Sequence, residues 1–161
     1  NGKGGRIPCD TWDNASLLCE AHDPASGSAF PLSLKTHRIS PGARNDWYIE
    51  IYGTQASARY SLSEPNRLEV LEYSPGREQT WRRIDLGQET AYASITPAIF
   101  QFGVSDAILQ MWAAFLYELD TGRTPSRFAG CVTPWESVAW HMLFTAALES
   151  HISGGTAKVL D

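Results

Sequence analysis

The hydrophobic pattern of this chain changes period once, near its middle, and that change most limits what the chain can fold into. Between residues 15 and 86, apolar side chains alternate with polar ones, as Ala15, Leu17 and Cys19 do with their neighbours. This is the period of a β-strand. From residue 105 onward, apolar side chains recur every three or four residues, as in a helix. Strands followed by helices predict an α+β fold.

Turn signals divide the first half into five or six short strands. The turns carry the expected residues, such as Pro24 and Gly27 in the first and Pro65 and Asn66 in a later one. The predicted strands are 15–22, 30–37, 47–52, 58–62, 68–73 and 80–86. Because such short turns join neighbouring antiparallel strands, we expect one large, mostly antiparallel sheet.

Two helices are expected after a loop from residue 87 to residue 103. Ser105 is the predicted cap of the first, with Asp106 in its first turn, and Gly122 is its predicted end. The second should begin with a capping box at residues 133–136 and end at residues 154–155, followed by a short strand at 156–160. The predicted apolar stripes are Ile108, Trp112, Phe115, Leu116 and Leu119 on the first helix and Trp140, Phe144, Leu148 and Ile152 on the second.

The two faces of the predicted sheet differ in character. Alternation assigns Trp47, Ile49 and Ile51 to a core that the helices cover on one face. The opposite face is rich in large side chains for a surface that only meets water. Its members are Leu18, Tyr48, Tyr52, Leu71 and Tyr73, beside Lys35, Glu50 and Glu69. Such a face is typical of an interface and predicts a homo-oligomer, although long loops could also cover it.

Composition excludes several classes of protein. The formal net charge is −5 and lysine and arginine form no run, which argues against nucleic acid as a partner. No apolar stretch approaches the roughly 20 residues that span a bilayer, so no membrane partner is expected. The cysteines are Cys9, Cys19 and Cys131, an odd number without a CxxC pair, which favours free thiols and a cytoplasmic location.

The common chemical motifs are missing from the sequence. It contains no GxGxxG, GxxxxGK[ST], HExxH or GxSxG pattern. The four histidines lie far apart, so we expect no metal site. His141, within the second predicted helix, is more readily explained by packing than by catalysis.

One loop carries residues that suit a polar, hydroxylated ligand. His37, Arg38, Arg44 and Trp47 lie between the second and third predicted strands and provide donors and an aromatic plane near a strand end. Gln101 and Phe102, in the long loop before the first helix, are candidates for the same cleft; such long loops are often functional. By composition alone, a solvated turn explains the first loop at least as well.

The order of several segments resembles the C-terminal domain of the glucose–fructose oxidoreductase and inositol dehydrogenase (Gfo/Idh/MocA) family. The resemblance covers nearly the whole chain from Asp13 onward. The turn Ile51-Tyr52-Gly53-Thr54-Gln55-Ala56-Ser57 and the helix start Thr133-Pro134-Trp135-Glu136 are its most specific parts. The other segments are residues 13–18, 65–70 and 112–116.

The resemblance implies a domain that works with another one. Members of the family join an N-terminal Rossmann domain to a C-terminal α+β domain, act on sugars, polyols and related compounds with NAD or NADP, and commonly associate through the sheet. The family's cofactor fingerprint and its catalytic lysine, aspartate and histidine have no counterpart here, so we expect no catalytic and no cofactor-binding residue in residues 1–161.

Three hypotheses follow for the function. The first is a fragment of an NAD(P)-dependent oxidoreductase that needs its own Rossmann domain as a partner; a start within an apparent loop, at Asn1-Gly2-Lys3, agrees with that expectation. The second is a stand-alone sugar-binding or dimerisation module of the same fold. The third, a small α+β hydrolase, lacks a nucleophile motif.

Overall fold

The computed structural model describes residues 12–87, 89–97, 99–123 and 130–160. The chain separates into two compact units. The first comprises residues 1–43 and 139–161, and the second comprises residues 44–138. Each is described by itself below.

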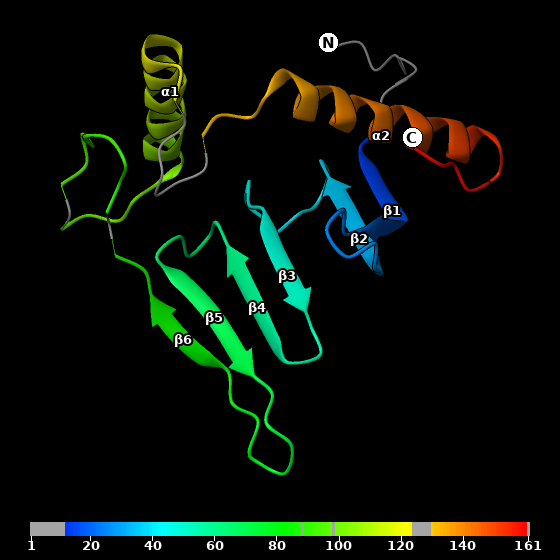
Figure 1. The fold of residues 1–161 in the computed structure, drawn as a ribbon, viewed down its shortest axis with the longest axis horizontal. Coiled ribbons are helices and arrows are strands. Elements are labelled where there is room, and N and C mark those ends of the chain that lie inside the picture. Colours follow the sequence, from blue (N-terminus) through cyan, green and yellow to red (C-terminus); the bar gives the residue numbers. More distant parts are fainter. Residues whose placement is uncertain (1–11, 88, 98, 124–129, 161) are drawn as a thin grey trace, which may run out of the picture. The chain divides into compact units, whose positions relative to one another are not determined.

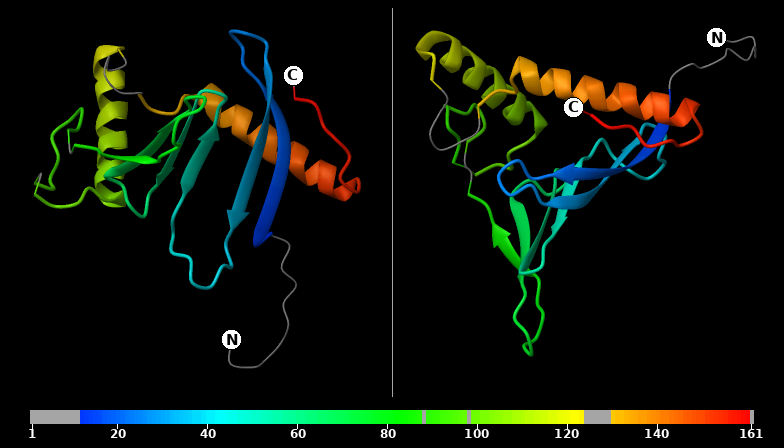
Figure 2. Two further views of the ribbon diagram at one scale, coloured as in Figure 1. Left: turned by 90° about the horizontal axis from the view of Figure 1, so that it is seen from below. Right: turned by 45° about the vertical axis from the view of Figure 1, so that its right-hand side comes forward.

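The first unit contains a β-hairpin of β1 (Asn14–His22) and β2 (Ala29–His37). The strands pair antiparallel over their whole length, from Asn14 opposite His37 to His22 opposite Ala29 (Figure 2). The Asp23 carboxylate holds the turn by accepting hydrogen bonds from the Ala25 and Ser26 amides at 3.0 and 3.2 Å. The Ser26 hydroxyl also donates to this carboxylate and, followed by the Ala25 amide, holds the pKa of Asp23 below its usual value.

The alternation predicted for the first strand is confirmed. The side chains of Ala15, Leu17, Cys19 and Ala21 are half-buried, and their neighbours are exposed. Leu18, which points the other way, is 89% exposed. The period of two therefore identifies the covered face of this strand correctly.

The second unit contains a four-stranded antiparallel sheet in the order β3-β4-β5-β6 (Figure 1). Its strands are β3 (Tyr48–Tyr52), β4 (Ala56–Ser61), β5 (Arg67–Glu72) and β6 (Arg82–Asp85). The β3–β4 turn requires a glycine, because a Cβ on Gly53 would lie 2.9 Å from the Ala56 carbonyl oxygen. The α+β class and the antiparallel pairing are confirmed, but the strands form two sheets where one large sheet was expected.

Helix α1 (Val104–Thr121) ends as expected, at Gly122 in the left-handed conformation, but its start differs from the prediction. Gly103, not Ser105, is the N-cap. Asp106 stands at the third helical position, where its carboxylate accepts a hydrogen bond from the Gly103 amide at 3.0 Å. Because Asp106 already serves the first turn from inside the helix, no capping side chain is needed before it.

Helix α2 (Pro134–Ile152) begins with the predicted capping box. The Glu136 carboxylate accepts hydrogen bonds from the Thr133 amide and hydroxyl at 2.7 and 2.8 Å, and the Glu136 amide donates to the Thr133 hydroxyl at 3.2 Å. Helix α2 is followed by two glycines with positive φ, Gly154 and Gly155, as predicted. The predicted strand at 156–160 is wrong: this segment is not paired with any described strand.

Within the second unit, α1 does not pack on the four-stranded sheet, and the packing of α2 on a sheet stays a prediction. Only Ala114 and Asp106 are buried among the described residues, and the stripes of both helices are exposed, with Trp112 at 56%. Trp47, Ile49 and Ile51, assigned to a helix-covered core, are more than half exposed. The loop before α1 docks on α1 itself through Gln110.

Candidate functional site

His37 and Arg38 lie in the first unit, at the end of β2. The Arg38 amide donates to the Asp13 carbonyl oxygen at 2.6 Å, and its guanidinium lies 3.5 Å from the Asp13 carboxylate. This ion pair connects the start of β1 with the end of β2. Asp13 therefore supports the strand ends, and Arg38 has a structural role beside any role toward a ligand.

Arg44 and Trp47 lie in the second unit, in the segment that leads into β3. Arg44 is exposed, and the Trp47 ring packs against Tyr60 with 5.7 Å between the ring centroids. Asp46 fixes the segment by accepting hydrogen bonds from the Ser61 hydroxyl at 2.8 Å and the Ser63 amide at 2.9 Å. The turn is thus pinned to the end of β4, which gives Trp47 a defined position.

Gln101 and Phe102 also belong to the second unit and immediately precede α1. The loop before them is anchored on the helix: the Tyr92 amide donates to the Gln110 side-chain oxygen at 3.1 Å, and the Gln110 amide donates back to the Tyr92 carbonyl oxygen at 3.1 Å. Two of the six predicted ligand-binding residues therefore lie in one unit and four in the other. Their assembly into one site stays a prediction.

The structure shows a charged hollow that the sequence did not single out. It is an open depression of about 180 Å³ in the second unit. Its lining residues are Arg59, Tyr60, Ser61, Glu64, Arg67 and Glu69. Alternation already assigns Arg59 to one face of β4, and Arg67 and Glu69 to one face of β5. That these side chains meet could be recognised only once the register of the two strands was known.

Glu69 is the centre of the hollow's charge network. Its carboxylate pairs with both Arg59 and Arg67, and Arg67 also pairs with Glu64 at 2.8 Å. The two arginines, Arg59 first, hold the pKa of Glu69 below its usual value. The Arg59 guanidinium also stacks on the Trp81 ring, 4.4 Å from its centroid.

This hollow suits a neutral polar ligand better than an anion. Two arginines and two glutamates line it, so their formal charges cancel. Burial raises the pKa of Tyr60, with a smaller contribution from Asp46, so that its phenol stays protonated at neutral pH. Its hydroxyl donates to the Pro65 carbonyl oxygen at 3.3 Å. Paired charges and hydroxyls of this kind can exchange hydrogen bonds with a hydroxylated molecule.

The described residues form neither a metal site nor a membrane-spanning helix. These residues contain no group of three or more His, Cys, Asp and Glu side chains placed to hold a metal ion. None of the helices described is both long and apolar enough to cross a membrane. Cys19 and Cys131 are free thiols, and Cys9 lies outside the described residues.

Comparison with known proteins adds no assignment: no family model matches this chain, and no curated protein sequence matches it. The resemblance to the Gfo/Idh/MocA oxidoreductases therefore rests on the segments quoted above and stays an expectation.

Proposed function

We propose that this chain is the C-terminal, substrate-facing domain of an NAD- or NADP-dependent oxidoreductase that acts on a sugar, polyol or related compound. The observation that supports the proposal is where the resembling segments lie. Each falls within or at the start of one regular element, in the order that the family has. Residues 13–18 open β1, 49–57 span the turn of the β3–β4 hairpin, 65–70 lead through β5, 112–116 lie in the middle of α1 and 133–137 open α2.

The proposal assigns a limited chemical task to these residues. Hydride transfer requires a nicotinamide held against the reacting carbon, and a Rossmann domain of the same protein would hold it. The present chain would orient the hydroxylated substrate, with Arg44 and Trp47 as the first candidates. Free thiols at Cys19 and Cys131 support a cytoplasmic location, because disulfides are rare there.

The 161-residue chain by itself is expected to bind neither NAD nor NADP. The physical reason is that the sequence contains no GxGxxG pattern, and its described residues form no glycine-rich turn between a strand and a helix N-terminus that could receive the pyrophosphate. Isothermal titration calorimetry of the chain with each dinucleotide tests this. Micromolar binding of either dinucleotide would contradict the proposal that a separate Rossmann domain binds the cofactor. The absence of any heat of binding would agree with the proposal.

In the protein that carries both domains, Arg44→Ala and Trp47→Ala should each raise the substrate KM or lower kcat. The effect should be about tenfold, because each change removes one donor or one stacking surface for a polar ligand. The dissociation constant for the dinucleotide should stay unchanged. Steady-state kinetics with a panel of sugars and polyols measure KM and kcat, and fluorescence titration measures the dissociation constant for the dinucleotide.

Matched controls are available on the same chain. Arg77 is exposed in the β5–β6 connection and Trp135 is exposed at the start of α2. Arg77→Ala and Trp135→Ala should leave both kinetic constants within twofold. Unchanged kinetics for Arg44→Ala and Trp47→Ala would return that segment to the role of a solvated turn.

A second candidate function is a dimerisation module, which one observation favours. Tyr48, Tyr52 and Tyr73 lie on one face of the four-stranded sheet and are each more than half exposed, and Tyr52 is 67% exposed. Exposed tyrosines are enriched at interfaces, because their rings bury much apolar area while the hydroxyl keeps a polar partner. Both functions can belong to one domain.

A further inference from the structure

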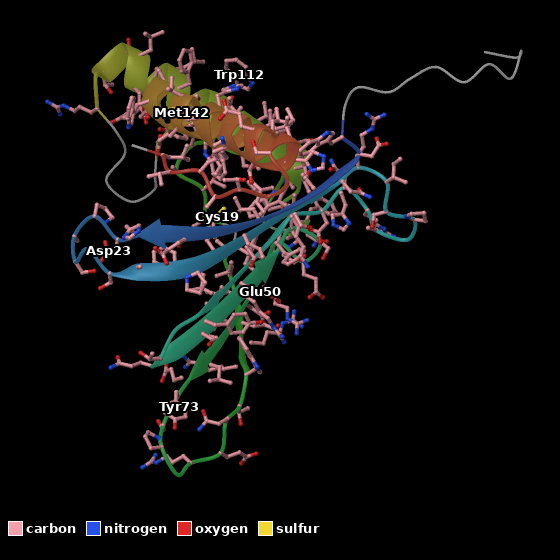
Figure 3. The ribbon with its side chains drawn as sticks, turned by 90° about the vertical axis from the view of Figure 1, so that its right-hand side faces the viewer. Cys19, Asp23, Glu50, Tyr73, Trp112 and Met142 are labelled. Carbon is pink, nitrogen blue, oxygen red and sulfur yellow. The ribbon has the colours of Figure 1, made fainter. Side chains whose placement is uncertain are left out.

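A row of alternating charges crosses the four-stranded sheet. The strand register places Glu50 opposite Arg59, Arg59 opposite Glu69, and Glu69 opposite Arg83. Because residues directly opposite each other in antiparallel strands share a face, all four side chains lie on the same face. We call this row the charge ladder. Each of the four strands contributes one residue to it, and its β3 member, Glu50, is labelled in Figure 3.

The charge ladder lies on the tyrosine-bearing face. Tyr48 and Tyr52 flank Glu50 along β3, two residues away on either side, so alternation puts the three side chains on one face. The opposite face carries the apolar side chains, with Ile49 opposite Tyr60 and Ile51 opposite Ala58. A surface that covers the tyrosines must therefore also meet the four charges.

The order of charges lets the charge ladder pair with a second copy of itself that runs in the opposite direction. Read from β3 to β6 it runs negative, positive, negative, positive. When a second copy faces it with the strand order reversed, each carboxylate meets a guanidinium: Glu50 meets Arg83 of the partner subunit, and Arg59 meets Glu69 of the partner subunit. A two-fold axis parallel to the strands and between the two sheets produces this arrangement. A two-fold axis along the row would instead place Glu50 against its own copy.

We propose that two copies of this chain pack face to face through the tyrosine-bearing face, and that the charge ladder sets their orientation, with β3 of one copy over β6 of the other. The proposal rests on the self-association suggested above and adds its geometry. Strands about 4.8 Å apart make the ladder about 14 Å long. Aligned sheets cross at about 30°, which displaces the ends by only a few ångströms, within reach of glutamate and arginine side chains.

The end residues are free to make these contacts. Glu50 is exposed and forms no ion pair with another described residue. Among the described residues, Arg83 forms an ion pair with Asp85 alone, two residues along the chain, at 3.0 Å, and both of these side chains are more than half exposed. Exposed pairs of this kind contribute little, so Arg83 can turn to a carboxylate on another molecule. The inner pair, Arg59 and Glu69, is already joined within the sheet and would extend its network across the interface.

Charge reversals at the ladder's two ends test the orientation. In the full 161-residue chain, Glu50→Arg or Arg83→Glu alone should weaken the dimer about tenfold at low salt, because each creates two like-charge contacts per dimer. The double variant Glu50→Arg/Arg83→Glu should restore wild-type affinity. Sedimentation-equilibrium experiments give the dissociation constants. Asp120→Arg, which makes the same change of net charge as Glu50→Arg at an exposed position of α1, is the matched control and should have no effect.

Mixing the two single variants gives an independent readout. A heterodimer of Glu50→Arg with Arg83→Glu has opposite charges at both ends, so mixing should recover wild-type affinity, and 0.5 M salt should reduce the differences among all variants. If the single charge reversals have no effect but Tyr52→Asp still makes the chain monomeric, the proposed orientation is wrong. The tyrosine-bearing face would then remain the interface. A monomeric wild-type chain would overturn the self-association as well. Neither result bears on the oxidoreductase proposal, which the dinucleotide and kinetic experiments test separately.

Discussion

Tyr52→Asp is expected to leave the chain monomeric at concentrations where the unchanged chain forms a dimer. Tyr52 is the last residue of β3 on the tyrosine-bearing face, opposite Ser57, and is 67% exposed. A two-fold interface loses two aromatic anchors at once, each worth on the order of 2 kcal/mol. The aspartate also introduces a charge that must be desolvated without a partner. The dissociation constant should therefore rise by a factor of about 100 or more, measured by light scattering across a concentration series.

The control for this variant is Ile95→Asp. Ile95 is 80% exposed in the loop before α1, so the change also replaces an exposed apolar side chain by a carboxylate outside the sheet. It should leave the dimer intact. If Tyr52→Asp remained dimeric, or if both variants formed aggregates of undefined size, a different surface would be responsible for association.

Asp106→Asn should loosen α1 and the loop that precedes it. The Asp106 side chain accepts hydrogen bonds from the Thr96 hydroxyl and the Gly103 amide, and the residue is among the few buried ones of the structure. The amide keeps the size of the side chain but removes the charge that strengthens both bonds. We expect the melting temperature of the second unit to fall by about 2–4 °C, measured by circular dichroism at pH 7.

The pH dependence of the same variant identifies the cause. The Thr96 hydroxyl, and after it the Gly103 amide, hold the pKa of Asp106 below its usual value of about 3.9. The stabilisation is therefore complete above pH 4 and is lost as the pH falls toward the lowered pKa of the folded state. Asp106→Asn should lose less stability than the wild type between pH 4.5 and pH 2.5. Asp120→Asn, an exposed position later in α1, should follow the wild type; equal acid sensitivity in all three proteins would contradict this role for Asp106.

The local elements of this fold could be predicted from short sequence signals. Alternation located all six strands, and the Asp23 turn and the Thr133–Glu136 capping box formed where their residues predicted. The start of α1 differed, because Asp106 satisfies the helix start from the third position and Gly103 replaces Ser105 as the cap. Such features depend on residues within a few positions of each other, which is why the sequence alone is sufficient for them.

The candidate site was only partly accessible from the sequence. The segment around Arg44 and Trp47 was found because donors and an aromatic ring occur together near a strand end. The hollow around Glu69 was not, because its arginines come from two strands and meet only when β4 and β5 pair in register. Likewise, the docking of Gln110 on the Tyr92 backbone joins residues 18 positions apart without any periodic signal.

The sequence by itself determined the six paired strands, the two helices and which side chains share a face of each strand, because these follow from a period of two or 3.6 residues. The antiparallel pairing followed from the short turns between the strands. Only the tertiary structure decided that the strands divide into sheets of two and four, that Trp47, Ile49 and Ile51 are not covered by α1, and that four separate charges form one ladder. The physical reason is that register and packing depend on contacts between distant segments. Periodicity defines the faces of an element but not the surface that each face meets.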